Sequence, residues 1–287
     1  MKHILINLYF PILCMLFMTA CEDPLELDMA NYTTKIVVDG YIEHGQFPLV
    51  LLTKSASYFS TIDSASLRNL VISRAKVTVS DGIKEEVLTL KKNDKYYPPY
   101  IYEGTEIRGE AGKTYSLKID YEGKSYTSET SIPPRVSLDS IWFKLAPGED
   151  SLGLLYAKIS DNPDREDYYR LFTQRTDKDK KFIPVYLSAI GDQYFNGTSF
   201  TFSVLRGSES ISDVRDDIYF RKGDLVKIKI CTIDRPHFDF WRTLERELYV
   251  TGNPFSSSGN EVITNIKGGA LGVWGGYNPQ VYQIVVK

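Results

Sequence analysis

From position 35 to its end, the chain of 287 residues repeats one local pattern: short runs of β-branched and aromatic residues, several of which alternate apolar with polar side chains. A period of two is the spacing of side chains on one face of a β-strand. Turn residues such as Asp81-Gly82 and Glu122-Gly123 separate the runs, because glycine tolerates the positive φ of hairpin turns. The pattern predicts a mainly β protein.

The strand pattern divides at Pro133-Pro134, since proline cannot donate a hydrogen bond to a β-ladder. Residues 35–133 are predicted to form an antiparallel, immunoglobulin-like sandwich, and residues 134–287 a second β-rich domain. The predicted strands of the first part are 35–42, 49–53, 75–79, 86–90, 114–119 and 125–128. Those of the second part are 140–145, 152–159, 168–173, 182–187, 200–204, 225–233, 272–274 and 281–286.

One amphipathic helix is predicted near residues 236–250. Asp234 is a candidate N-cap, Pro236 stands near the first turn, and Gly252 with Asn253-Pro254 ends the run. Apolar residues recur at helical spacing at Phe238, Trp241, Leu244 and Leu248. This stripe is expected to cover a sheet; the alternative is a ligand groove.

The amino terminus is typical of a secreted lipoprotein. Residues 1–20 combine a short polar start with an apolar stretch that is too short and too broken to span a membrane. The stretch ends in Met18-Thr19-Ala20-Cys21, which resembles a bacterial lipobox, so Cys21 is the predicted lipidation site. Acyl chains on Cys21 would hold the protein on a membrane. The alternative is an ordinary cleavage site beside a chance cysteine.

Residues 21–34 are predicted to form an acidic tether. Glu22 and Asp23, directly after the cysteine, resemble the surface-export signal of lipoproteins in the Bacteroidetes. That signal would place the body of the protein on the cell surface. The alternative is a solvated linker without a sorting role.

The reactive side chains are few, which argues against an enzyme. If Cys14 leaves with the signal and Cys21 is acylated, Cys231 is the only thiol left, and no internal disulfide can form. The common hydrolase, metalloprotease and nucleotide-binding motifs are absent. Gly268-Gly269 and Gly275-Gly276 are predicted to make tight turns or bulges rather than a phosphate cradle. Cys231 is expected to be inert packing in its strand.

Charge excludes a further class of partner. The chain has 34 Lys and Arg against 37 Asp and Glu, and no polybasic run. The sequence therefore contains no basic segment that could bind nucleic acid by releasing counterions from its phosphates. No cofactor is predicted. Carboxylates that are adjacent in sequence, such as Glu85 and Glu86, would point to opposite faces of a strand and cannot act as a pair.

Two segments are weak candidates for binding. Four carboxylates between positions 161 and 167 could form a calcium loop, although the EF-hand pattern is missing and a solvated loop explains them equally. They are Asp161, Asp164, Glu166 and Asp167. Four tyrosines and two prolines between positions 96 and 102 could form a contact surface for a glycan, peptide or protein, or could shield a sandwich edge. They are Tyr96, Tyr97, Tyr100 and Tyr102.

Several motifs together resemble one protein family. They are Ile36–Ile42, Ala75–Asp81, Gly112–Leu117, Asn253–Phe255 and Asn265–Trp274, and the resemblance spans nearly all of the chain after the signal. The family is the Bacteroidetes outer-membrane lipoprotein family called domain of unknown function 4249. It implies an amino-terminal sandwich similar to carboxypeptidase-regulatory-like domains and a TonB-dependent receptor as a partner. It implies no catalytic residue.

The sequence thus predicts a non-enzymatic lipoprotein, anchored in the outer membrane of a Gram-negative bacterium and exposed on its surface. Its expected role is that of an accessory or ligand-binding partner of a TonB-dependent transport system. Two alternatives stay open: a cell-surface hydrolase whose carboxylates are distant in sequence, and a structural or adhesion lipoprotein.

Overall fold

The computed structural model describes residues 33–56, 68–96, 98–193, 195–208, 218–250 and 261–287. Residues 34–287 belong to one compact unit, and the expected boundary at Pro133-Pro134 lies inside it. The predicted signal, Cys21, most of the tether, Tyr97 and the Asn253–Phe255 motif lie outside the described residues. Within the described residues, no helix is long and apolar enough to cross a membrane.

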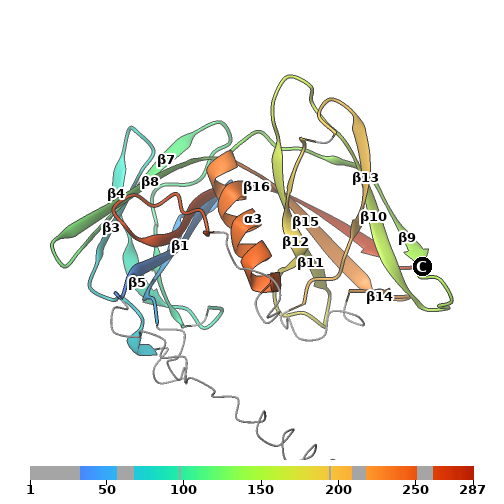
Figure 1. Ribbon diagram of the computed structural model, residues 1–287, viewed down its shortest axis with the longest axis horizontal. Coiled ribbons are helices and arrows are strands. Elements are labelled where there is room, and N and C mark those ends of the chain that lie inside the picture. Colours follow the sequence, from blue (N-terminus) through green and yellow to red (C-terminus); the bar gives the residue numbers. More distant parts are fainter. Residues whose placement is uncertain (1–32, 57–67, 97, 194, 209–217, 251–260) are drawn as a thin grey trace, which may run out of the picture. The chain divides into compact units, whose positions relative to one another are not determined.

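The described part of the chain is mainly β with one long helix, and the alternating pattern predicts the β content (Figure 1). The strands of the first half are β1 (Ile36–Glu43), β2 (Leu49–Lys54), β3 (Lys76–Ser80), β4 (Glu85–Val87), β5 (Thr89–Lys92), β6 (Tyr100–Glu103), β7 (Thr114–Tyr121) and β8 (Lys124–Ser131). Those of the second half are β9 (Leu138–Leu145), β10 (Leu152–Ser160), β11 (Tyr168–Arg175), β12 (Ile183–Gly191), β13 (Ser199–Val204), β14 (Phe220–Arg221), β15 (Leu225–Ile233) and β16 (Leu271–Val285).

One eight-stranded sheet runs through both halves of the chain, in the order β12-β11-β15-β16-β1-β2-β6-β5. The junction is β16, which pairs in parallel with β1 and antiparallel with β15. Two separate strands were predicted at 272–274 and 281–286, but the structure has one strand here. Pro279 fits within it because β1 pairs only as far as Tyr277, so the missing N–H lies beyond that ladder.

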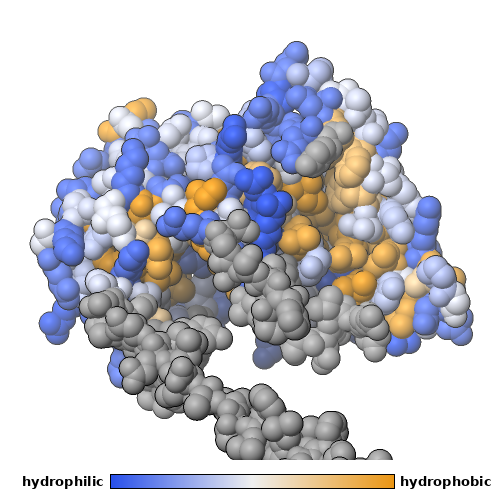
Figure 2. Space-filling model, viewed as in Figure 1, coloured by the Kyte–Doolittle hydropathy of each residue, from blue (hydrophilic) through white to orange (hydrophobic). Residues whose placement is uncertain are grey.

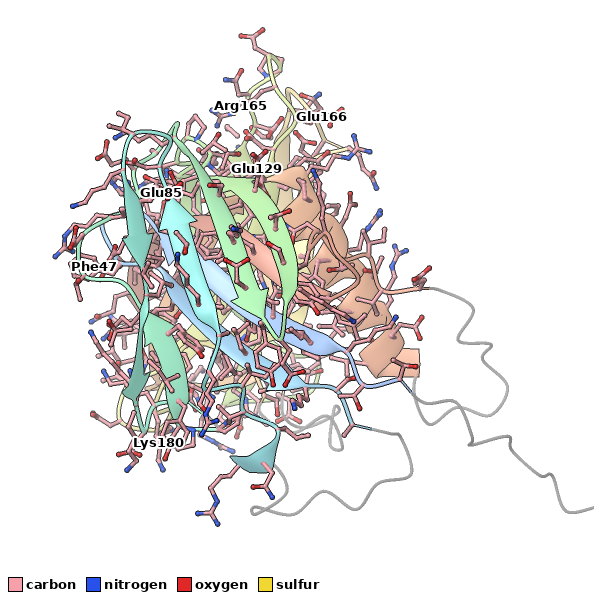
Figure 3. All side chains as sticks on the ribbon, turned by 90° about the vertical axis from the view of Figure 1, so that its left-hand side faces the viewer. Phe47, Glu85, Glu129, Arg165, Glu166 and Lys180 are labelled. Atoms are coloured by element: carbon pink, nitrogen blue, oxygen red, sulfur yellow. The ribbon has the colours of Figure 1, made fainter. Side chains whose placement is uncertain are left out.

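Two smaller sheets cover one face of the eight-stranded sheet. The first, β4-β3-β7-β8, is the near layer in Figure 3, with β1 behind it. The second joins β13, β10, β14 and β9. Even-numbered residues of β16 point into the apolar cores beneath both layers: Trp274 into the first, Tyr282 and Ile284 into the second. The two halves therefore keep separate cores but share one sheet.

The predicted strand at 86–90 is divided between two sheets. Leu88 separates β4 in the small sheet from β5 in the large one. The carboxylates at its start behave as their alternation predicts: Glu85 is exposed, and Glu86 is buried. Glu86 accepts hydrogen bonds from three consecutive backbone N–H groups, those of residues 105, 106 and 107.

The predicted helix is present as α3 (Arg235–Val250). Asp234 is its N-cap, since its Oδ1 accepts a hydrogen bond from His237 N at 3.1 Å. Its Oδ2 accepts bonds from Thr130 Oγ1 and Ser131 N, both at 2.8 Å, which ties the helix start to β8. Phe238 is buried, as the stripe predicts, whereas Leu248 is 44% exposed. In Figure 2 the outer side of α3 is hydrophilic, and the surface between α3 and strands β10 and β13 is apolar.

Candidate functional site

The second face of the eight-stranded sheet carries the helix and a cavity. On β1, residues 36, 38, 40 and 42 point into the core, so Asp39, Tyr41 and Glu43 point to this opposite face. The β1–β16 register places Tyr41 beside Gly275 and Glu43 beside Tyr277. The same alternation on β15 and β11 brings Lys229, Arg170 and Phe172 to this face. Residues far apart in sequence therefore meet by strand pairing alone.

The cavity has a volume of about 340 Å³. Strands β1, β11, β15 and β16, helix α3 and the two turns that follow β5 and β11 supply its walls. Six of its twelve lining residues are aromatic and six are charged: Tyr41, Tyr96, Phe172, Phe182, Trp241 and Tyr277, and Asp39, Glu43, Lys95, Arg170, Lys181 and Lys229. Aromatic walls with a few placed polar groups are typical of small-molecule sites.

Arg170 is the central charged group of the cavity and is only 5% exposed. Its guanidinium stacks on the ring of Trp241, 3.3 Å from the ring centroid. Nε donates to Ser188 Oγ at 3.1 Å, and Nη1 donates to Tyr277 Oη at 2.6 Å. Nη2 donates to no described residue. The side chain is thus held rigidly while part of its donor capacity stays unused.

A buried carboxylate balances Arg170 from behind. Glu245 on α3 is 7% exposed and accepts hydrogen bonds from Ser188 Oγ and, at 3.3 Å, from Ala189 N. Burial raises the pKa of Glu245, and the bond from Ser188 and the charge of Arg170 oppose that rise. Ser188 therefore links the helix to the arginine, which fixes α3 as one wall of the cavity.

Asp39 and Glu43 bring two carboxylates to the cavity in different states. Glu43 forms an ion pair with Lys229 at 3.3 Å. The Lys229 ammonium also lies over the rings of Phe172 and Phe182, 4.9 and 5.2 Å from their centroids. Asp39 makes no side-chain hydrogen bond or ion pair with the described residues. Its side chain is exposed to the cavity space, yet the surrounding protein raises its pKa, and Arg170 lowers it in part.

His237 packs beside the cavity, with its ring 4.5 Å from that of Tyr277. It is 1% exposed, and burial, followed by the charge of Arg170, lowers its pKa to about 3, so the ring is neutral at physiological pH. A Cβ on Gly275 would lie 2.2 Å from this ring, and one on Gly276 would lie 2.3 Å from Ser131 O. The prediction that Gly275-Gly276 forms a turn or bulge is wrong, because both lie within β16, where close packing requires glycine.

The structure separates the three described tyrosines of the aromatic segment. Tyr96 lines the cavity, where its hydroxyl lies 2.7 Å from that of Tyr41. Tyr100 is 37% exposed, whereas Tyr102 is 3% exposed. A contact role for Tyr102 is wrong, because its hydroxyl accepts from Ala75 N and donates to Ile72 O inside the first core. Ile101 beside it is also buried, so both faces of β6 are covered at this point.

The candidate calcium carboxylates lie in the loop between β10 and β11, whose residues Arg165 and Glu166 are labelled in Figure 3. Asp161 accepts from Tyr169 Oη and Gly197 N, Asp167 pairs with Arg165 at 2.8 Å, and Glu166 accepts from Tyr168 Oη. Asp164 uses its backbone N–H in a turn with Asn162. Protein donors thus engage three of these carboxylates, and the described residues hold no cluster of three metal-ligating side chains.

Cys231 is fully buried, on the face of β15 opposite Ile228 and Ile230, as its alternation predicts. Burial raises the pKa of its thiol to about 12. A thiol in this state is protonated and unreactive at neutral pH.

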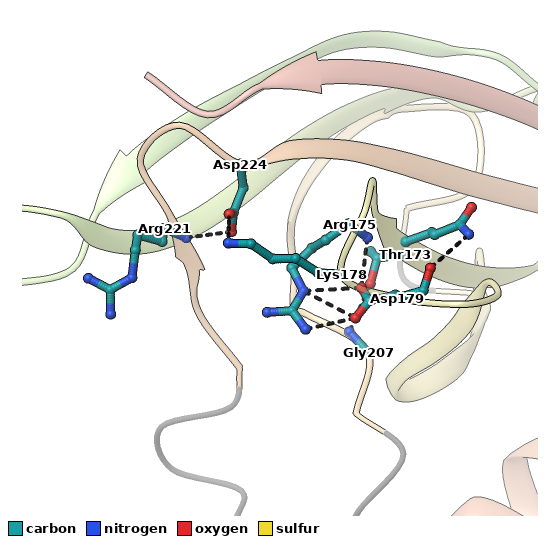
Figure 4. A network of polar contacts seen from close by, with 8 residues as sticks. Thr173, Arg175, Lys178, Asp179, Gly207, Arg221 and Asp224 are labelled. Carbon is teal, nitrogen blue, oxygen red and sulfur yellow. Dashed lines mark hydrogen bonds and ion pairs between the residues drawn. The ribbon is translucent and has the colours of Figure 1, made fainter.

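A second cavity, of about 360 Å³, lies beside the β11–β12 turn. Two of its four lining cations form ion pairs, as Figure 4 shows: Arg175 Nη2 lies 2.7 Å from Asp179 Oδ1, and Lys178 Nζ lies 2.6 Å from Asp224 Oδ1. Arg175 Nε also contacts the Asp179 carboxylate, so this pair is a fork that closes the turn. The arrangement is that of a structural clamp and is a weaker candidate than the first cavity.

Sequence reasoning found two cavity residues through functional signals, Tyr96 in the aromatic segment and Trp241 in the helix stripe with its ligand-groove alternative. It missed Asp39, Arg170 and Tyr277. The signal that could have revealed the site is the polar face of β1. Asp39 and Glu43 alternate with buried residues in this strand, which is paired along both of its edges. Such a face must meet other polar groups or a ligand.

The fold and the cavity define a β-rich, sandwich-like protein with a polar and aromatic site on the face of its long sheet that carries α3. The chain belongs to the family described as domain of unknown function DUF4249, whose model matches residues 22–283. Among curated proteins, none matches the chain.

Proposed function

We propose that this protein is a lipid-anchored, non-enzymatic binding protein of the bacterial outer membrane, which takes a small ligand into the cavity between β1, β11 and α3. One observation carries the proposal: a rigidly held Arg170 and an unpaired Asp39 share an aromatic cavity. Arg170 is buried and has an unused donor, which costs free energy that a ligand accepting from it would recover. The lipobox at Cys21 and the acidic tether support an anchor and a place on the cell surface.

The same cavity argues against the hydrolase alternative. Its two carboxylates, Asp39 and Glu43, stand four residues apart on one strand, about 13 Å between their Cα atoms at 3.3 Å per residue. Glycosidase pairs need about 5 to 9.5 Å between carboxyl groups. Glu43 is also engaged by Lys229. The role we propose is that of an accessory which presents its ligand to a TonB-dependent receptor.

The test is affinity purification of the tagged full chain from gently solubilised outer membranes, beside the variant Cys21→Ala. The unaltered chain should carry acyl label, fractionate with the outer membrane and recover a TonB-dependent receptor, and the variant should lose label and membrane retention. Equal membrane retention of the two chains would refute the anchor. Recovery of no receptor in crosslinked samples would refute the transport role.

A further inference from the structure

The cavity's lining has more positive than negative charge. Four cations, Lys95, Arg170, Lys181 and Lys229, face two carboxylates, Asp39 and Glu43, which leaves a formal charge of +2. Glu245 stands behind Arg170 but reaches it through Ser188 rather than directly. A low-dielectric cavity strengthens the effect of such an imbalance on a bound ion.

Cations of the protein already occupy the aromatic faces that could hold a cationic ligand. Lys229 lies over Phe172 and Phe182, and Arg170 lies over Trp241 at 3.3 Å and over Phe172 at 4.9 Å. An ammonium group on a ligand would therefore be repelled by Lys229 and Arg170 at the ring faces that could otherwise bind it by a cation–π interaction.

The polar groups left without partners are mostly donors. Arg170 Nη2, on a side chain that is 95% buried, donates to no described residue, and neither does Lys95 Nζ. Trp241 Nε1 is buried and also lacks a partner. Asp39 is the one lining carboxylate without an ion pair among the described residues. Unused donors call for a ligand rich in acceptors.

We propose that the cavity binds an organic anion, a carboxylate on a flat apolar body, with the carboxylate on Arg170 and the body between the aromatic walls. A guanidinium presents parallel donors that match a carboxylate. Tyr41 and Tyr277 provide the ring surfaces and are set edge-on to each other, with their centroids 5.8 Å apart. This inference rests on the proposed binding function and specifies the chemistry of its ligand.

The experiment compares three probes of one shape and different charge: 2-naphthoate, 2-naphthamide and 2-naphthylmethylammonium. Each is titrated calorimetrically at neutral pH into the full chain in nanodiscs, with empty nanodiscs as the blank. Naphthoate should bind at least tenfold more tightly than the amide, and the ammonium probe should bind most weakly. Raising the salt concentration should weaken only the naphthoate.

Two variants and one control locate the effect. Arg170→Gln should weaken naphthoate binding at least tenfold and Lys95→Gln about threefold, with little change for the amide. Lys92→Gln is the matched control, because Lys92 belongs to the same hairpin but pairs with Asp94 and does not line the cavity. If a thermal melt shows that Arg170→Gln does not fold, the Lys95→Gln variant and the three probes still test the anion inference.

Equal or tighter binding of the ammonium probe, or naphthoate binding that neither variant weakens, would overturn the anion inference while leaving a binding cavity in place. Absence of binding by all three probes would also overturn it. The anchor and receptor experiment then judges the proposed function independently.

Discussion

His237 should make the protein less stable in mild acid. Its folded-state pKa is about 3, because burial and then the charge of Arg170 disfavour the imidazolium, whereas an unfolded histidine titrates near 6.5. Because the folded-state pKa is the lower one, the unfolded chain binds the proton first. The contribution of His237 is therefore complete above about pH 6.5 and is lost as the pH falls toward 3.

The size of the effect follows from the two pKa values. Between pH 7 and pH 5, proton uptake by the unfolded chain lowers the free energy of unfolding by about 2 kcal/mol for this one group. Buried carboxyl groups whose pKa is raised also contribute to the pH dependence of stability. Among them are Asp234, whose pKa burial raises and which accepts from His237 N, and Glu245, which is coupled to Arg170. A comparison of variants must separate their contributions from that of His237.

The assay is urea unfolding of the unaltered chain and of His237→Gln, each at pH 7 and pH 5. On going from pH 7 to pH 5, the unaltered chain should lose about 2 kcal/mol more unfolding free energy than His237→Gln, since glutamine takes up no proton. His44→Gln is the control, because His44 is partly exposed and only accepts a bond from Ala111 N. A stability difference that is the same at both pH values would refute a neutral, buried His237.

Three further predictions concern single residues around the helix. Gly275→Ala should destabilise the fold by about 2 kcal/mol or more in urea unfolding, because its Cβ would lie 2.2 Å from the His237 ring, and His237→Ala in the same chain should recover part of the loss. Asp234→Ala should cost about 2 to 3 kcal/mol in the same assay, since it removes the N-cap and the acceptor of Thr130; retention of full stability would refute the capping role. Cys231 should resist iodoacetamide at pH 8 in the native protein and react fully in denaturant, as followed by mass spectrometry, and rapid native labelling would contradict its burial.

Local patterns predicted those parts of the fold that depend on neighbours in sequence. The Glu122-Gly123 hairpin has positive φ at both residues, 49° and 75°, as such a turn requires. The helix begins after Asp234 and packs Phe238 against the sheet. The pairing of β1 with β16, which unites the two halves, was not predictable, because strand order in a sheet depends on contacts between segments that are distant in sequence.

The candidate site followed the same division. The density of tyrosines around position 96 predicted a contact role for Tyr96. Its place in the cavity, however, depends on Tyr41, which is 55 positions earlier and whose hydroxyl lies 2.7 Å from that of Tyr96. Arg170 and Asp39 looked like ordinary strand residues, since a single polar residue in a half-buried strand usually faces solvent. They became site residues because β16 and β15 set their strands in one sheet and α3 closed over that face.

The sequence by itself determined the β class, the position of the helix and the buried state of Cys231, and it predicts the anchor at Cys21. Each of these depends on chemistry within a few residues, on side-chain period, capping or the order of residues around a cysteine. Only the tertiary structure decided that one sheet joins both halves, that Gly275 must be glycine and that Arg170 meets aromatic rings from three elements. These features arise from strand order and from packing between distant segments, which no local pattern encodes.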